Sequence, residues 1–312
     1  MKKRRLLFLT ALAAVLIHGT AGAQVFQAVM LERFGIMDPT RTGARPFALG
    51  GAYTAVSDDV FGLVYNPAGL VQVDRNAFSI GIHHVSVDID NAYGGLRSAQ
   101  GGSYTSLGHL AGVFPYEEMD NNIVLGVGVF RAGTGDLEWI KSGLWSGGAM
   151  SMNRYMQSGT IYQYRFGIGV DLSPAVALGA ALVVWEQSLD IVDEIRYEDT
   201  DSIALYTDDV EVDLDGVSLE FGVMFFPHEA LQAGVTVSSP AWLSYDGDGV
   251  VDYSGTYKSG PYVGWESDPA WGIIEEDYTL PMRFRGGLAL VTDLVLVTAD
   301  VEYVDWTQTK YE

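Results

Sequence analysis

Three arginines lie in segments where apolar and polar residues alternate, and their guanidinium groups are suited to binding an anion. Arg165 lies in Tyr162–Leu172, and Arg283 and Arg285 lie in Leu280–Leu290. A guanidinium can hold a carboxylate through two parallel hydrogen bonds, so each arginine is a candidate ligand-binding residue. The alternative is pairing with acidic side chains of the same protein, which we favour because an unpaired charge away from water is costly.

Aromatic residues and methionines are concentrated in two long segments without regular alternation, Ala132–Ser158 and Ser239–Tyr278. The first contains Trp139 and Trp145, the candidate residues for contacting an apolar ligand. Exposed side chains of these types form an adaptable surface that suits the capture of a lipid-like molecule. An equally weighted alternative is that they pack against one another or form the aromatic girdle of a membrane protein.

The sequence predicts no metal site, no cofactor and no enzyme activity. Asp246–Asp252 is a poor match to a calcium-binding loop, because it lacks the third near ligand and the glutamate at position twelve. His83 and His84 are adjacent on a predicted strand, so they face opposite sides and cannot chelate one ion. Nucleophile and metallohydrolase motifs such as Gly-x-Ser-x-Gly and His-Glu-x-x-His do not occur.

The composition excludes several other classes of protein. The 312 residues include 18 basic and 40 acidic ones, and the net charge of −22 disfavours binding to nucleic acid. The absence of cysteine excludes disulfide scaffolds and thiolate metal sites. Only the N-terminal apolar run approaches membrane-spanning length, so a bundle of membrane-spanning helices is excluded.

Residues 1–23 are typical of a secretory signal peptide. A positive region, Lys2–Arg5, precedes the apolar run Leu6–Ile17, and the small residues Ala21–Ala23 form a cleavage site before Gln24. The apolar run is too short to serve as a stable uncleaved anchor, which is the alternative. Cleavage would remove four basic residues and change the net charge from −22 to −26.

The rest of the chain repeats one pattern, in which apolar and polar or small residues alternate over about ten residues. Strand side chains alternate between faces, so each such segment has one apolar face and one polar face. Nine candidate strands follow, most of them close to the length that a tilted strand needs to cross a membrane. They cover Asn76–Asp88, Thr105–Pro115, Asn121–Arg131, Tyr162–Leu172, Pro174–Leu189, Val217–Phe225, Leu231–Val237, Leu280–Leu290 and Val295–Tyr303.

The connections between these strands are alternately short and long. The short ones are Tyr116–Asp120, Ser173–Pro174, Pro227–Glu229 and Thr292–Asp293, and the long ones are Ile89–Tyr104, Ala132–Ser158, Asp190–Asp209 and Ser239–Tyr278. Short turns at one rim and long loops at the other are typical of an outer-membrane β-barrel, whereas a soluble β-sandwich, the alternative, has no reason to keep this parity. Because bacterial barrels have an even number of strands, nine strands predict an incomplete barrel that lacks C-terminal strands, unless the count is wrong by one.

The segment 24–75 does not alternate and is rich in Gly and Ala. Gly50 and Gly51 allow close approach of the backbone or a positive φ angle, and Ser57, Asp58 or Asp59 is suited to capping a short helix or turn. Asn66-Pro67-Ala68-Gly69 favours a tight turn, with proline at its second position and glycine at its fourth.

Two regions resemble a known family. Gly43–Leu70 is similar to the N-terminal region of FadL-type outer-membrane transport proteins, and the same elements occur in PorV-type barrels. Leu280–Gln308 resembles a late strand pair of the FadL-type proteins. The resemblance implies an antiparallel 14-stranded barrel whose N-terminal segment folds into the lumen as a hatch. The chain departs from that pattern because it contains about nine strands and has unusually acidic loops.

The resemblance implies a passive outer-membrane channel for hydrophobic molecules, such as long-chain fatty acids or aromatic hydrocarbons. We therefore expect a signal peptide (1–23), a hatch (24–75) and a barrel (76–312) that contacts outer-membrane lipid in a Gram-negative-type envelope. The alternative is a PorV-type component of protein secretion or surface attachment, whose partner would be a secreted protein. The residues expected in the hatch or its gate are Gly50, Gly51, Asp58, Asp59, Asn66, Pro67, Ala68 and Gly69.

Replacing both Trp139 and Trp145 with serine should lower the uptake of a hydrophobic substrate, because the apolar capture surface is lost. Uptake is measured in cells whose variant barrel assembles normally, as judged by heat-dependent gel mobility. Unchanged uptake with intact assembly would remove the capture role.

Overall fold

The computed structural model describes residues 42–93, 96–118, 121–134, 137–144, 150–198, 202–257, 265–266, 270–308 and 310–311. The predicted signal peptide, the first part of the segment 24–75 and Trp145 lie outside these residues. Among the described helices, none is both long enough and apolar enough to cross a membrane.

The described strands form one 14-stranded sheet in which the paired strands are antiparallel. The strands are β1 (Ala77–Tyr93), β2 (Leu96–Glu118), β3 (Asn121–Thr134), β4 (Leu137–Leu144), β5 (Met150–Ser173), β6 (Val176–Glu198), β7 (Ser202–His228), β8 (Leu231–Ser238), β9 (Ala241–Tyr257), β10 (Trp265–Glu266), β11 (Ala270–Leu280), β12 (Arg283–Val291), β13 (Leu296–Val304) and β14 (Lys310–Tyr311). The helices are α3 (Ala44–Ala48), α4 (Gly62–Tyr65), η1 (Pro67–Gln72) and η2 (Trp306–Gln308).

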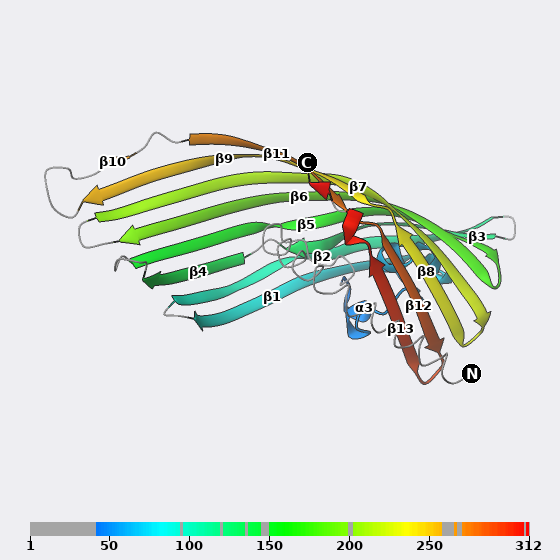
Figure 1. Ribbon diagram of the computed structural model, residues 1–312. Helices are drawn as coiled ribbons and strands as arrows, with labels where there is room; N and C mark the ends of the chain where they lie inside the picture. Colours follow the sequence, from blue (N-terminus) through cyan, green and yellow to red (C-terminus); the bar gives the residue numbers. More distant parts are fainter. Residues whose placement is uncertain are drawn as a thin grey trace, which may run out of the picture.

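The main path through the sheet is β1-β2-β3-β5-β6-β7-β8-β12-β13, and these strands cover most of each of the nine predicted ones, in the predicted order. The sheet curves into a trough, and the blue N-terminal segment with α3 lies beneath the curve (Figure 1). β7 pairs with β8 along one half and with β9 along the other. Only Ser239 and Pro240 separate β8 from β9, and because proline has no N–H to donate to a ladder, it suits such an interruption.

Apolar side chains are exposed and polar side chains are buried on these strands, which is the reverse of a water-soluble protein. On β5, Phe166 is 51% exposed, whereas its polar neighbours Gln163 and Arg165 are each 1% exposed. On β1, Phe78, Ile80 and Ile82 are at least 70% exposed. Apolar rows on the outside and polar or small residues inside are the pattern of a barrel wall that faces lipid. A β-sandwich would bury the apolar rows between two sheets, so that alternative is wrong.

The four segments expected to be long loops are largely strand, which corrects that part of the sequence analysis. The β1–β2 ladder runs to Tyr93↔Leu96, and the β6–β7 ladder runs to Glu198↔Ile203. As a result β7 has 27 residues, far more than the 9–11 or so that cross a membrane. These extensions escaped detection because Ile191–Ile195 has two apolar, then two acidic, then one apolar residue, so apolar and polar residues do not alternate in its sequence.

The outward face changes from apolar to acidic within one row of neighbouring strands. Val184, Val217 and Trp242 form one cross-strand row, and the next outward row is Glu186, Asp215, Ser244 and Asp277. Farther along the same face the exposed acidic residues are Asp190, Asp209, Glu211, Asp213, Asp246, Asp248 and Glu275. The apolar stretch Val217–Phe225 has the length of a membrane crossing, so a bilayer around it would leave the acidic rows outside the hydrocarbon, on the side of the long hairpins.

The two edges of the path are β1 and β13, and within the described residues each has a ladder partner on one side only. An unpaired backbone edge is too costly to leave in hydrocarbon, so both edges require a partner when the protein is in a bilayer.

Replacing Leu219 with arginine should destabilise the folded barrel in lipid vesicles by about 2–4 kcal/mol, because Leu219 lies on the outward face of the apolar stretch. The matched control is Asp213→Arg on the same strand and face but within the acidic rows, where the charge stays in water. Urea-dependent unfolding measures both, and an equal loss of stability would show that the boundary is misplaced.

Candidate functional site

The candidate site is built around residues 42–73, called here the inner segment, which covers the polar inner face of the sheet. Its core residues Tyr53, Leu63, Tyr65 and Leu70 are fully buried. They form one cluster with wall residues from both sides of the trough, namely Ala111, Val113, Val124, Phe130 and Ala289. Partly buried residues of both edge strands, Ala77 and Leu296, pack against the same cluster. The inner segment therefore connects the two ends of the open sheet.

Asn66 fixes the fold of the inner segment. Its side chain accepts a hydrogen bond from the Ala68 N–H at 3.1 Å, and η1 begins at Pro67. The Gly69 N–H donates to the Asn66 carbonyl at 2.9 Å, so the predicted tight turn is confirmed. The Asn66 amide also donates to the carbonyls of Thr54 at 2.9 Å and of Val223, on β7, at 3.2 Å. One fully buried side chain thus ties the turn to the wall.

Gly50 and Gly51 of the inner segment adopt a backbone conformation that favours glycine. Gly50 and Gly51 have φ angles of +68° and +83°, and a Cβ on either would meet no atom within 4 Å. Positive φ, rather than close approach, is therefore the reason for glycine at these positions. Asp59 caps the turn that leads into α4, because its Oδ1 accepts from the Phe61 N–H at 2.9 Å, whereas α4 itself has no side-chain cap at its N-cap residue, Phe61.

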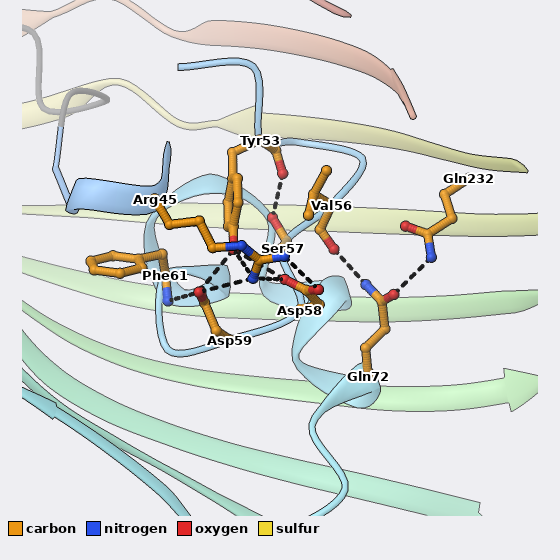
Figure 2. Close-up of polar contacts among 9 residues, drawn as sticks. All are labelled: Arg45, Tyr53, Val56, Ser57, Asp58, Asp59, Phe61, Gln72 and Gln232. Carbon is orange, nitrogen blue, oxygen red and sulfur yellow. Dashed lines mark hydrogen bonds and ion pairs between the residues drawn. The ribbon is translucent and has the colours of Figure 1, made fainter. Parts of the chain in front are cut away.

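A polar cluster of Arg45, Tyr53, Asp58 and Asp59 holds α3 against the rest of the inner segment (Figure 2). Arg45 donates to both carboxyl oxygens of Asp58, and the Tyr53 hydroxyl donates to Asp59 Oδ2 at 2.8 Å. Burial raises the pKa of the Tyr53 phenol above its ordinary value, and the charges of Asp59 and Asp58 raise it further. Tyr53 therefore stays a neutral donor at physiological pH.

Close backbone approach seats the inner segment on the wall. A Cβ built on Gly179 of β6 would lie 2.1 Å from the Ala68 nitrogen, and one on Gly222 of β7 would lie 2.0 Å from Asn66 Oδ1. Real side chains do not tolerate such distances, so the wall needs glycine where η1 lies against it.

Arg165 is the most deeply buried charge of this interface. Its Nη1 donates to Glu220 Oε2 at 2.8 Å and to the Leu63 carbonyl of the inner segment at 2.7 Å, and its Nε donates to Gln163 at 2.9 Å. The Arg165 and Glu220 side chains are 1% and 2% exposed. Removing one partner of such a pair would leave an uncompensated buried charge, which is strongly unfavourable.

The other wall charges also have protein partners. Asp300 on β13 accepts from the backbone N–H groups of Tyr53 and Thr54 at 2.9 and 2.8 Å. Arg285 pairs with Glu302. Of the two alternatives for the arginines, the geometry at Arg165 and Arg285 is that of pairing within the protein, and a ligand carboxylate would have to displace Glu220 or Glu302. Arg283 begins β12, opposite Ser238 and Val304.

A cavity of about 580 Å³ lies at the short-turn end of the inner segment, lined in part by Gln72, Asn122, Asp171 and Phe226. Gln72 donates to the Val56 carbonyl at 2.6 Å and accepts from the Gln232 amide of β8 at 3.0 Å (Figure 2). Gln72 was not predicted to be a site residue, because its partner Gln232 lies 160 residues away in the sequence. Trp139 lies on β4, opposite Tyr155 of β5, so the structure does not bring it to the inner segment.

Replacing Gly179 with valine should destabilise the docked inner segment by about 1–3 kcal/mol, because the new side chain must displace Ala68. Limited proteolysis of residues 42–73 and thermal unfolding measure the effect. Gly286→Val is the matched control, because a Cβ at Gly286 of β12 meets nothing within 4 Å. Equal protection in both variants would contradict the close approach.

Comparisons with known proteins agree with this architecture. No family model and no curated protein matches the sequence. Among solved structures the fold is similar to that of the CymD monoaromatic hydrocarbon channel, with a TM-score of 0.54 over 87% of this chain and 71% of that chain. The identity is 15%, so the likeness extends to the fold. It supports the FadL-type resemblance at the level of architecture and gives no support to the PorV-type alternative.

Proposed function

We propose that this chain forms an outer-membrane channel that passes small hydrophobic molecules, and that residues 24–75 are its hatch. The observation that carries the proposal is the inner segment seated on the polar face of a wall whose opposite face is apolar. A wall of this kind places lipid outside, and the inner segment obstructs passage through the trough.

Passage requires the hatch to move relative to the wall, driven by the gradient of the substrate itself. The turn Asn66–Gly69 and the positive-φ pair Gly50–Gly51 are the proposed gating elements, together with Asp58 and Asp59. Asn66 is bound to the wall by its hydrogen bond to the Val223 carbonyl, whereas Asp58 and Asp59 pair with Arg45 of the inner segment itself. These contacts can break without disrupting the strand ladders. No hydrolysis or redox step is needed, because a ligand that prefers the open state shifts the population toward it.

The name of the structural neighbour favours aromatic hydrocarbons over long-chain fatty acids as the substrate class. Trp139 and Trp145 are proposed to capture the substrate before it enters. Trp139 fits this role by position, because β4 pairs with the half of β5 that lies beyond the membrane crossing, on the side of the long hairpins.

The test fastens the hatch to the wall at the Gln72–Gln232 bridge. The natural chain contains no cysteine, so Gln72→Cys with Gln232→Cys introduces the only two thiols. A short bifunctional methanethiosulfonate reagent should join them and strongly reduce the uptake of p-xylene into proteoliposomes. A reducing agent cleaves the link and should restore uptake.

Each single-cysteine variant treated with the same reagent is the control for modification without cross-linking. Rapid uptake through a fully cross-linked hatch would contradict the gating role. Failure of the untreated protein to carry either p-xylene or p-cresol would contradict the channel itself.

A further inference from the structure

A second apolar cluster lies on the inner face of the sheet, on the side of the Arg165–Glu220 pair toward the long hairpins. We call it the aromatic cluster. Its buried members come from β3, β5, β6, β7, β9 and β11, and the most prominent are Trp185, Leu214, Tyr245 and Tyr278. The rings of Tyr245 and Tyr278 are edge to face, with their centroids 6.4 Å apart. It is separate from the core beneath the inner segment.

Two buried amides belong to this part of the face. Gln163 on β5 lies directly opposite Trp185, and Gln187 on β6 lies two residues from Trp185 and directly opposite Leu214. Since residues two apart on a strand share a face, Gln187 and Trp185 face the same side. Gln163 is 1% exposed and Gln187 is 2% exposed.

These amides retain hydrogen-bonding capacity that the described residues do not use. Neither the Nε2 nor the Oε1 of Gln187 has a partner, and the Nε2 of Gln163 has none, although its Oε1 accepts from Arg165. By contrast, the Trp185 indole N–H donates to Ser218 at 3.1 Å. Buried amides are almost always hydrogen-bonded, so an amide with two unused atoms among aromatic and aliphatic side chains points to a missing polar partner.

We propose, on the basis of the channel function above, that the aromatic cluster binds an apolar ring-sized molecule carrying one hydroxyl group, which hydrogen-bonds to Gln187. A hydroxyl group can donate to Oε1 and accept from Nε2, so it matches an amide with both atoms unused. A carboxylate can only accept, and a bare hydrocarbon can do neither. Gln163 supplies a second donor on the neighbouring strand. Phenols and alcohols of similar size are therefore the substrates that this site selects.

Selection follows from the cost of leaving the amide unpaired. A hydrocarbon of the same shape would make the same apolar contacts with the aromatic cluster but would leave Gln187 without a partner, whereas the hydroxyl group of a phenol would hydrogen-bond to it. Sites built to hydrogen-bond one group of a ligand discriminate strongly against the analogue that lacks the group. Gln187 thus determines which ligand the site prefers.

The test compares p-cresol with p-xylene, which differ by a hydroxyl in place of one methyl group. Equilibrium binding to the detergent-solubilised full chain should favour p-cresol by about tenfold, corresponding to one net hydrogen bond. Gln187→Leu should abolish this preference by weakening p-cresol while leaving p-xylene unchanged or tighter. Gln157→Leu is the matched control, because this buried glutamine already accepts a hydrogen bond from the Tyr155 hydroxyl. It should keep the preference.

Equal affinities in the natural protein, or an unchanged preference in Gln187→Leu, would overturn this inference. Uptake into proteoliposomes separates it from the channel proposal. Equal entry of both compounds leaves the channel standing and removes the specificity, whereas entry of neither contradicts the channel. Heat-dependent gel mobility verifies that each variant is folded.

Discussion

The ion pair between Arg165 and Glu220 is the interaction on which the interior depends. The pair lies on the inner face of the wall, and both side chains are almost completely shielded from water. Arg165 also donates a hydrogen bond to the Leu63 carbonyl of the inner segment. Two opposite charges in such a place are tolerable only when each satisfies the other and the remaining donors find partners. The inner segment supplies one of those partners, so the wall charge and the docked segment stabilise each other.

The same alternation of side chains explains both the outside and the inside of the molecule. Apolar residues at every second position face lipid, which leaves polar residues and glycines for the inner face. Gly179 and Gly222 then let the backbone of the inner segment approach the wall directly, while Asn66, Arg165 and Asp300 supply the hydrogen bonds. A single period of two in the sequence therefore specifies a lipid-facing exterior and an interior that accepts a polar, tightly seated segment.

Local patterns predicted the nine strands of the main path and the turn at Asn66, because each depends on residues close together in the chain. Partners that are distant in sequence were not predictable. Arg165 left two alternatives open until Glu220, 55 residues away, was placed beside it. No sequence pattern marked Gln187 as a site residue, because its amide is recognised as unpaired only when the neighbouring strand places Leu214 opposite it. The long hairpins were mistaken for loops because apolar and polar residues do not alternate in sequence along stretches such as Ile191–Ile195.

The change from apolar to acidic rows on β6, β7, β9 and β11 has a consequence for the depth at which this wall would sit in a membrane. Sinking by one row would push the carboxylates of Glu186, Asp215 and Asp277 into hydrocarbon, and rising by one row would lift Val217 and Trp242 into water. Both displacements are unfavourable, so the depth of immersion is fixed on this flank. A thicker bilayer must then thin around these strands rather than draw them in.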